Sequence, residues 1–157
     1  MTRPSVVRRA TARRGEPLNI FGDLIYIKVA SEDSGGRYSL LECVTGPGEG
    51  PPLHVHHRED EGFYVLEGQY LVQAGEERFE VGPGDFVSVP RDIPHCFRNI
   101  GETTGTMLLT LEPGGLEEFF AEVAAVSGPP DPTALGPIFV KYGLELLGPP
   151  LGESDVA

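Results

Sequence analysis

Glycine and proline recur so often along this chain that long regular elements have little room to form. The 157 residues include 21 glycines and 15 prolines, and the apolar residues between them gather into short runs. Ile25, Ile27 and Val29 alternate with their neighbours, which gives an extended segment one wholly apolar face. Because 39% of the residues are hydrophobic, such segments can bury a core instead of remaining disordered. The pattern predicts an all-β fold, an antiparallel sandwich or barrel.

The expected strands are short and lie before residue 113. They comprise residues 5–9, 24–29, 38–44, 69–74, 78–81, 85–89 and 107–112, with a turn over 31–37. Beyond them, the spacing of Leu116, Phe119, Phe120 and Val123 predicts an amphipathic helix of about three turns. A second, short helix is expected over 137–142, followed by a loose tail after Pro150.

A chain of this length is most economically one domain with one core. We divide it into a basic N-terminal arm, residues 1–14, a barrel core, residues 15–113, and a C-terminal helix and tail, residues 114–157. We expect the C-terminal part to pack on the barrel or on the partner in a homodimer, because its apolar stripe and the apolar start of the chain exceed what one small barrel needs.

Charge is unevenly distributed along the chain, whose net charge is −12. The first 14 residues carry five arginines and no acid, so the remainder is strongly acidic. An acidic body repels phosphate backbones, which argues against a nucleic-acid partner. The basic start lacks the apolar core of a secretory signal, and no stretch approaches the ~20 apolar residues that a membrane span requires. We therefore expect a cytoplasmic protein without a membrane partner.

The two cysteines, Cys43 and Cys96, are too few for a disulfide framework in a chain of this size. We expect both to be small buried residues in a reducing compartment. Cys96 follows His95 directly, so it should point to the opposite face of the same strand.

Histidines and one glutamate form the pattern with the clearest chemistry. His54 and His56 are two residues apart, so on a strand they share a face while His57 points away. Glu61 follows five residues later, and His95 is the only distant histidine that could complete the set. Such a set is typical of a metal site on strands.

Each of these residues also has an ordinary structural explanation. The joint pattern favours a metal site, but the separate alternatives remain open. They are surface or hydrogen-bonded histidines at His54 and His56, a core histidine at His95, and one more solvated acid at Glu61, beside Glu59 and Asp60. We expect Glu59 and Asp60 to supply turn chemistry or solvated charge.

Two motifs resemble those of the cupin superfamily. The first is Gly48-x5-His54-x-His56-x4-Glu61-x6-Gly68, and the second is Gly84-x5-Pro90-x-Asp92-x2-His95-x3-Asn99. The stretches PPLHVHHREDEGFYVLEG, GGLEEFF and KYGLELLGPPL are similar to small single-domain bacterial cupins grouped with quercetin 2,3-dioxygenase. One departure is Asp92, where that family has glycine. Aspartate tolerates turn conformations better than most residues, so the turn before His95 can survive.

The resemblance implies a jelly-roll β-barrel that holds a divalent metal ion through three histidines and one glutamate, often as a homodimer. His54, His56, Glu61 and His95 stand at the matching positions. The ion can be Mn, Fe, Co, Ni, Cu or Zn, since this ligand set accommodates all of them.

Three neutral imidazoles and one carboxylate leave a bound divalent ion with a net positive charge and open coordination positions. Such a site suits an enolate-like substrate that is attacked by O₂ in a dry pocket. Glu61 would be a ligand in the resting site and would accept the proton of the substrate hydroxyl. The pocket-lining candidates are Phe63, Val65, Phe86 and Phe97, although such residues are usually core.

Three functions fit this ligand set. The first is a metal-dependent dioxygenase acting with O₂ on a flavonol or similar aromatic enol, the second a non-catalytic metal- and small-ligand-binding cupin, and the third an isomerase or cyclase. A fold does not choose between them. Polar groups converging beside the metal would favour a sugar-like ligand, and a deep apolar slot an aromatic one.

Overall fold

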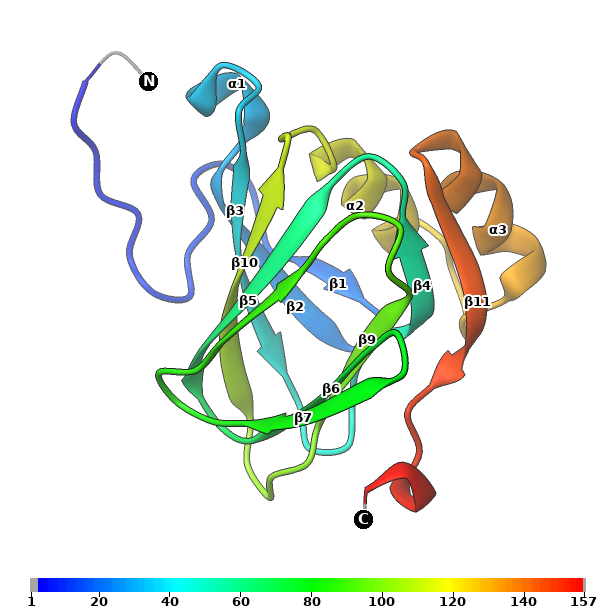
Figure 1. Ribbon diagram of the computed structural model, residues 1–157. Coiled ribbons are helices and arrows are strands. Elements are labelled where there is room, and N and C mark those ends of the chain that lie inside the picture. Colours follow the sequence, from blue (N-terminus) through cyan, green and yellow to red (C-terminus); the bar gives the residue numbers. More distant parts are fainter. Residues whose placement is uncertain (1–2, 157) are drawn as a thin grey trace.

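Two antiparallel β-sheets form the walls of a barrel in the computed structural model, which describes residues 3–156 (Figure 1). Six strands in the order β1-β2-β3-β10-β5-β8 make one sheet, and five in the order β11-β4-β9-β6-β7 make the other. Their bounds are β1 Leu18–Ile20, β2 Asp23–Val29, β3 Ser39–Thr45, β4 Pro52–His56, β5 Asp60–Glu67, β6 Tyr70–Ala74, β7 Glu77–Val81, β8 Phe86–Val89, β9 His95–Asn99, β10 Gly105–Glu112 and β11 Leu144–Pro150. The predicted all-β jelly-roll barrel is confirmed.

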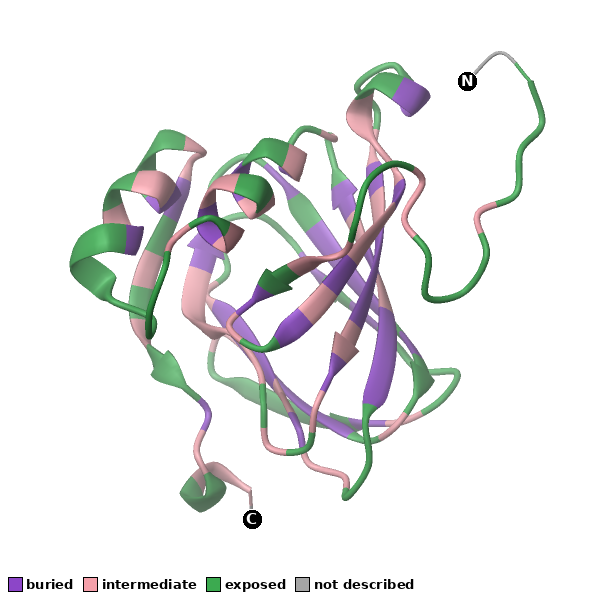
Figure 2. Cartoon of the chain, turned by 180° about the vertical axis from the view of Figure 1, so that it is seen from behind, coloured by how far each residue is buried: buried purple, intermediate pink, exposed green. Residues whose placement is uncertain are grey.

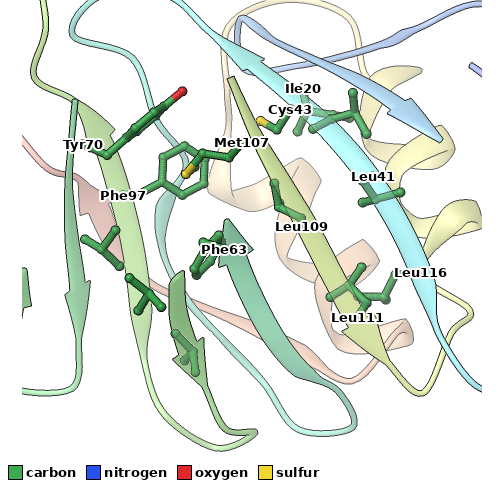
Figure 3. Close-up of a cluster of buried hydrophobic side chains, with 14 of the residues drawn as sticks. Ile20, Leu41, Cys43, Phe63, Tyr70, Phe97, Met107, Leu109, Leu111 and Leu116 are labelled. Carbon is green, nitrogen blue, oxygen red and sulfur yellow. The ribbon is translucent and has the colours of Figure 1, made fainter. Parts of the chain in front are cut away.

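The core lies between the two sheets, where alternate residues of each strand turn inward (Figures 2 and 3). Phe63 on β5, Leu41 on β3 and Met107 on β10 are almost completely buried. Tyr70 and Phe97 of the other sheet pack against them from the facing wall. The short alternating segments of the sequence are therefore the strands, and their apolar faces form one core.

Helices occupy the C-terminal part and cover one end of the barrel (Figure 1). They are α2 Glu117–Ala124 and α3 Pro132–Lys141. Two shorter elements are α1 Ser31–Ser34, early in the chain, and a 3-10 turn over Glu153–Asp155. Leu116, Phe119 and Val123 are buried in the main core, as the helical spacing predicted. None of the helices within residues 3–156 combines the length and the hydropathy that crossing a membrane would take.

Several expected elements differ in the structure. The helix expected over 137–142 starts earlier, at Pro132, because Asp131 caps it by accepting a hydrogen bond from the Thr133 amide at 2.9 Å. The segment expected as a turn over 31–37 contains the short helix α1, which ends at Gly35 in the left-handed region. Residues 144–150, which were not expected to form a strand, are β11 and pair with β4.

The tail after Pro150 is not loose, contrary to expectation. The Leu151 side chain is buried in a small second cluster with Leu71 and Cys96. Arg98 donates to the Leu151 carbonyl at 2.9 Å, and Arg78 pairs with Asp155 at 3.0 Å. These partners come from β7 and β9, so only the folded sheet can hold the tail.

The predicted strand over 5–9 is wrong, because this segment has no regular structure and Val6 is 75% exposed. The arm is held instead through charge. Arg9 pairs with Glu67, Arg14 pairs with Glu32, and Arg13 lies 2.7 Å from Asp33. The uneven charge of the sequence thus reflects a basic arm that lies against an acidic body.

A buried ion pair also fastens the arm to the barrel. The Lys28 ammonium lies 2.6 Å from the Glu42 carboxylate and donates to the carbonyls of Arg8 and Thr11, each at 2.7 Å. Glu42 accepts in turn from the Ala10 amide at 2.9 Å. Both charged side chains are almost completely buried.

We expect Glu42→Ala to lower the free energy of unfolding by about 3–5 kcal/mol, because it leaves the Lys28 charge buried without its counter-ion. Urea denaturation would measure this loss. Glu122→Ala is the matched control: it breaks the exposed pair with Lys141 and should cost about 1 kcal/mol or less. Equal losses in the two variants would contradict the assignment of Glu42 as an anchor.

Candidate metal centre

Both walls of the barrel contribute to a cluster of His54, His56, Glu61 and His95. His54 and His56 lie on β4, and His95 begins β9, where it is the register partner of His54. Glu61 comes from β5 in the opposite sheet. One donor atom from each of the four side chains lies within 4.8 Å of the others. The structure therefore brings together all four residues that the sequence singled out.

Backbone carbonyls orient two of the imidazole rings. His54 Nδ1 lies 2.7 Å from the Pro52 carbonyl, and His95 Nδ1 lies 2.9 Å from the Ile93 carbonyl. A carbonyl oxygen only accepts, so each Nδ1 carries a proton and each Nε2 is the atom available to the cluster. The rings of His54 and His95 pack with their centroids 4.5 Å apart.

The Glu61 carboxylate lies among the rings. Its Oε2 is 2.8 Å from His95 Nε2 and 3.4 Å from His56 Nε2. Burial alone would raise the pKa of Glu61, but the surrounding histidines outweigh it and bring the pKa to about 2. Burial and the neighbouring imidazoles lower the pKa of His54 to about 3. At neutral pH the cluster thus offers an ionised carboxylate and a neutral imidazole, the forms that bind a cation.

His95 Nε2 lies at the position where a cation would bind, within hydrogen-bond distance of Glu61 Oε2. Burial lowers its pKa, but the hydrogen bond to Glu61, the charge of Glu61 and the Ile93 carbonyl together outweigh burial and raise the pKa. The proton between His95 Nε2 and Glu61 would be released on metal binding. Three imidazole nitrogens and one carboxylate oxygen, buried and already convergent, fit a first-row divalent metal ion.

Glu59 is a residue that the sequence pattern misplaced. It was expected to be solvated or to shape a turn, but its side chain is buried, with Oε2 3.5 Å from His56 Nδ1. Neither atom has a hydrogen-bond partner among the described residues. Asp60 does behave as expected, since it is exposed and pairs with Arg91 at 3.0 Å. Residues 59–61 are three consecutive acids, and the sequence does not indicate that Glu59 lies beside the His56 ring.

A carboxylate beside the outer nitrogen of a metal-binding histidine fixes the ring and increases its basicity. We therefore expect Glu59→Ala to weaken divalent-metal affinity by about 10–100-fold, measured by competition with a chelating dye. Asp60→Asn, which alters the adjacent exposed acid, should leave the affinity unchanged. An unaltered affinity in Glu59→Ala would rule out this orienting contact.

His57 lies outside the cluster, as the alternation of strand residues predicted. Its Nδ1 is 2.6 Å from Asp92 Oδ1, and its side chain is 44% exposed. Asp92 has a φ of 67°, so it occupies the left-handed conformation for which the family pattern uses glycine. The turn before His95 is thus preserved with aspartate, which in addition gains His57 as a partner.

A narrow cavity of about 60 Å³ opens beside the cluster. Most of its wall is aromatic or aliphatic, and includes Phe63, Phe97, Phe119 and Phe139. Four polar side chains of the described chain line it, namely His54, His56, Glu61 and Asp23.

Two of the four predicted lining residues are absent from the described wall of this cavity. Val65 is completely buried in the core, and Phe86 is 58% exposed on the outside of the barrel. The ring of Phe86 covers Gly62, where a Cβ atom would lie 2.7 Å from its Cζ. Parity could not separate Val65 from Phe63, because both residues face inward from β5 and are buried. Phe86 belongs to the outer face of β8.

Comparison with known proteins gives a consistent family. Residues 41–115 match the cupin domain family. The uncharacterized protein MJ1618 of Methanocaldococcus jannaschii is 39% identical over 67 residues, 43% of this chain and 54% of that protein. The quercetin 2,3-dioxygenase of Bacillus subtilis is 31% identical over 100 residues, 63% of this chain and 29% of that protein. This chain therefore spans about half the length of the first relative and less than a third of the second.

Among solved structures, a predicted oxalate decarboxylase from Thermotoga maritima shares the architecture. The TM-score is 0.62 at 20% identity, and the match covers 69% of this chain and 99% of that chain. At this identity the likeness shows the fold alone.

Proposed function

This chain belongs to the cupin superfamily, and from that premise we propose that it is a divalent-metal-dependent dioxygenase that opens an aromatic enol with O₂. His54, His56, Glu61 and His95 would hold the ion. The observation that carries the proposal is the buried histidine and glutamate cluster at an apolar cavity. An apolar wall with aromatic side chains favours a flat aromatic ligand over a sugar, whose hydroxyls would need several polar partners.

The side chains of the cavity would have different roles in the reaction. When bound, a divalent ion would supply Lewis acidity and open positions for an anionic oxygen. Glu61 would accept the proton of the substrate hydroxyl, since its low pKa keeps it ionised at neutral pH and it faces the cavity. Phe63 and Phe97 would position the substrate ring and exclude water from the reacting atoms.

Glu61→Gln tests this division of roles directly. It keeps the shape and a weaker oxygen ligand but removes the proton acceptor, so the metal should largely remain. Oxygen uptake with a flavonol should fall by about 10²–10⁴-fold, the range typical of losing a general base. Elemental analysis and an oxygen electrode would measure the two quantities, with Asp60→Asn as the control. If the wild type, loaded with each plausible metal, consumes no oxygen with any aromatic enol, the binding-protein alternative replaces the dioxygenase.

We also propose a homodimer. The stripe on α2 is already buried within the chain, so it is not available to a partner. Exposed apolar residues remain on the outer face of β5 and β8, where Tyr64 pairs with Phe86 and Leu66 lies nearby. Such a patch suits an isologous contact between two copies. Light scattering at tens of micromolar should give the dimer mass, a concentration set by ordinary dimer affinities, and a monomer would contradict the proposal.

A further inference from the structure

We propose that Asp23 is a second polar anchor of the substrate cavity, and that it exchanges a hydrogen bond with an oxygen of the substrate remote from its enol. The inference rests on the proposed function and narrows its substrate class to aromatic enols that carry a second, distant hydroxyl or carbonyl oxygen. Asp23 is the one polar residue of the described cavity wall that does not belong to the metal cluster.

The Asp23 carboxyl lacks part of the bonding that a buried acid needs. The residue is 5% exposed, and its Oδ1 has no hydrogen-bond partner among the described residues. Its Oδ2 lies 3.9 Å from Cys43 Sγ, a weak donor, and the Thr45 hydroxyl also donates to the carboxyl. Burying a carboxyl without full partners costs stability, and such exceptions call for an explanation. A ligand that enters the cavity and bonds to Oδ1 supplies one.

The carboxyl groups of Asp23 and Glu61 lie at different positions along the strand direction of the six-stranded sheet, toward the start and the end of β10 respectively. Glu61 pairs with Leu111, near the end of β10. Leu24, which follows Asp23, pairs with Val44, and Val44 pairs with Thr106 near the start of β10. Cys43 lies between them. Burial is the main reason that the pKa of its thiol is raised, and the charges of Asp23 and Glu61 both add to this effect. A ligand bound at the metal centre would therefore meet Asp23 with its far end.

The surroundings of Asp23 favour its neutral form. Burial raises the pKa of Asp23 to about 7, and the charge of Glu49 acts in the same direction. The Thr45 hydroxyl and the Cys43 thiol, both on β3, act in the opposite direction through hydrogen bonds. A protonated carboxyl can donate to a carbonyl oxygen or accept from a hydroxyl without placing a charge in an apolar cavity.

Two matched pairs of metal-binding enols test the contact, because the members of each pair differ by one remote hydroxyl. Allomaltol and kojic acid have one ring, and galangin and kaempferol have three. Binding to the nickel-loaded protein would be measured by titration calorimetry without oxygen, so that no ligand is consumed. We expect the wild type to bind the hydroxylated member of at least one pair about 5–10-fold more tightly, the worth of one net hydrogen bond.

Asp23→Leu should abolish this preference, and Asp23→Asn, which keeps a neutral donor and acceptor, should retain most of it. Asp85→Asn, at an exposed turn away from the cavity, serves as the control, and thermal melting would verify that each variant folds. The assignment is overturned if the wild type shows no preference in either pair, if Asp23→Leu keeps it, or if Asp23→Asn loses it completely. Preferential binding without oxygen uptake would instead remove the dioxygenase and leave the role of Asp23 intact.

Discussion

Replacing His95 by alanine is expected to abolish retention of the divalent metal. His95 provides the β9 side of the cluster, and its Nε2 lies 2.8 Å from Glu61 Oε2. Alanine removes a ligand that the three remaining side chains cannot replace, and it also frees Glu61 from its closest partner. Metal affinity should fall by more than the factor of about 10–100 that is typical of changing a residue outside the ligand shell. Elemental analysis after gel filtration would measure it, and His54→Ala should behave in the same way.

His57→Ala is the matched control for this experiment. His57 directly follows His56 in the sequence, but its side chain faces solvent. Its Nδ1 lies 2.6 Å from Asp92 Oδ1. The metal content of His57→Ala should equal that of the wild type within error. If His57→Ala lost the metal and His56→Ala kept it, the assignment of the inward face of β4 would be wrong by one residue.

Asp23→Asn is expected to stabilise the metal-free protein at alkaline pH relative to the wild type. The pKa of Asp23 is raised from 3.8 to about 7 by burial. Between these two values the folded state holds a proton that the unfolded state has released. The contribution of this group to stability is therefore fully present below pH 4 and is lost as the pH rises to 7.

The size of this effect follows from the shift. Between pH 5 and 8 the free energy of unfolding of the wild type should fall by roughly 2–3 kcal/mol more than that of Asp23→Asn. Urea denaturation of both proteins at the two pH values would measure the difference, in which the contributions of other titrating groups cancel. Asp85→Asn should follow the wild type. A constant difference between wild type and Asp23→Asn across this range would show that Asp23 is not held protonated by burial.

The sequence alone determined the architecture and singled out the four residues of the histidine and glutamate cluster. Alternation along a strand tells which residues share a face, because the side-chain period of a strand is two. That rule separated His54 and His56 from His57. The helical period of 3.6 residues, a different local rule, predicted the inward stripe of α2. Spacing and turn residues located most of the strands, since both signals act within a few residues of one another.

Tertiary structure decided which charged groups are buried and what they contact. Glu59 and Asp60 are adjacent acids, yet one lies beside the His56 ring and the other pairs with Arg91 in solvent. Asp23 begins an ordinary strand, and only the closure of the barrel places it in the cavity. The arm and the tail likewise find their partners on distant strands. Burial of a charge depends on residues far away in the chain, and a local pattern carries no information about them.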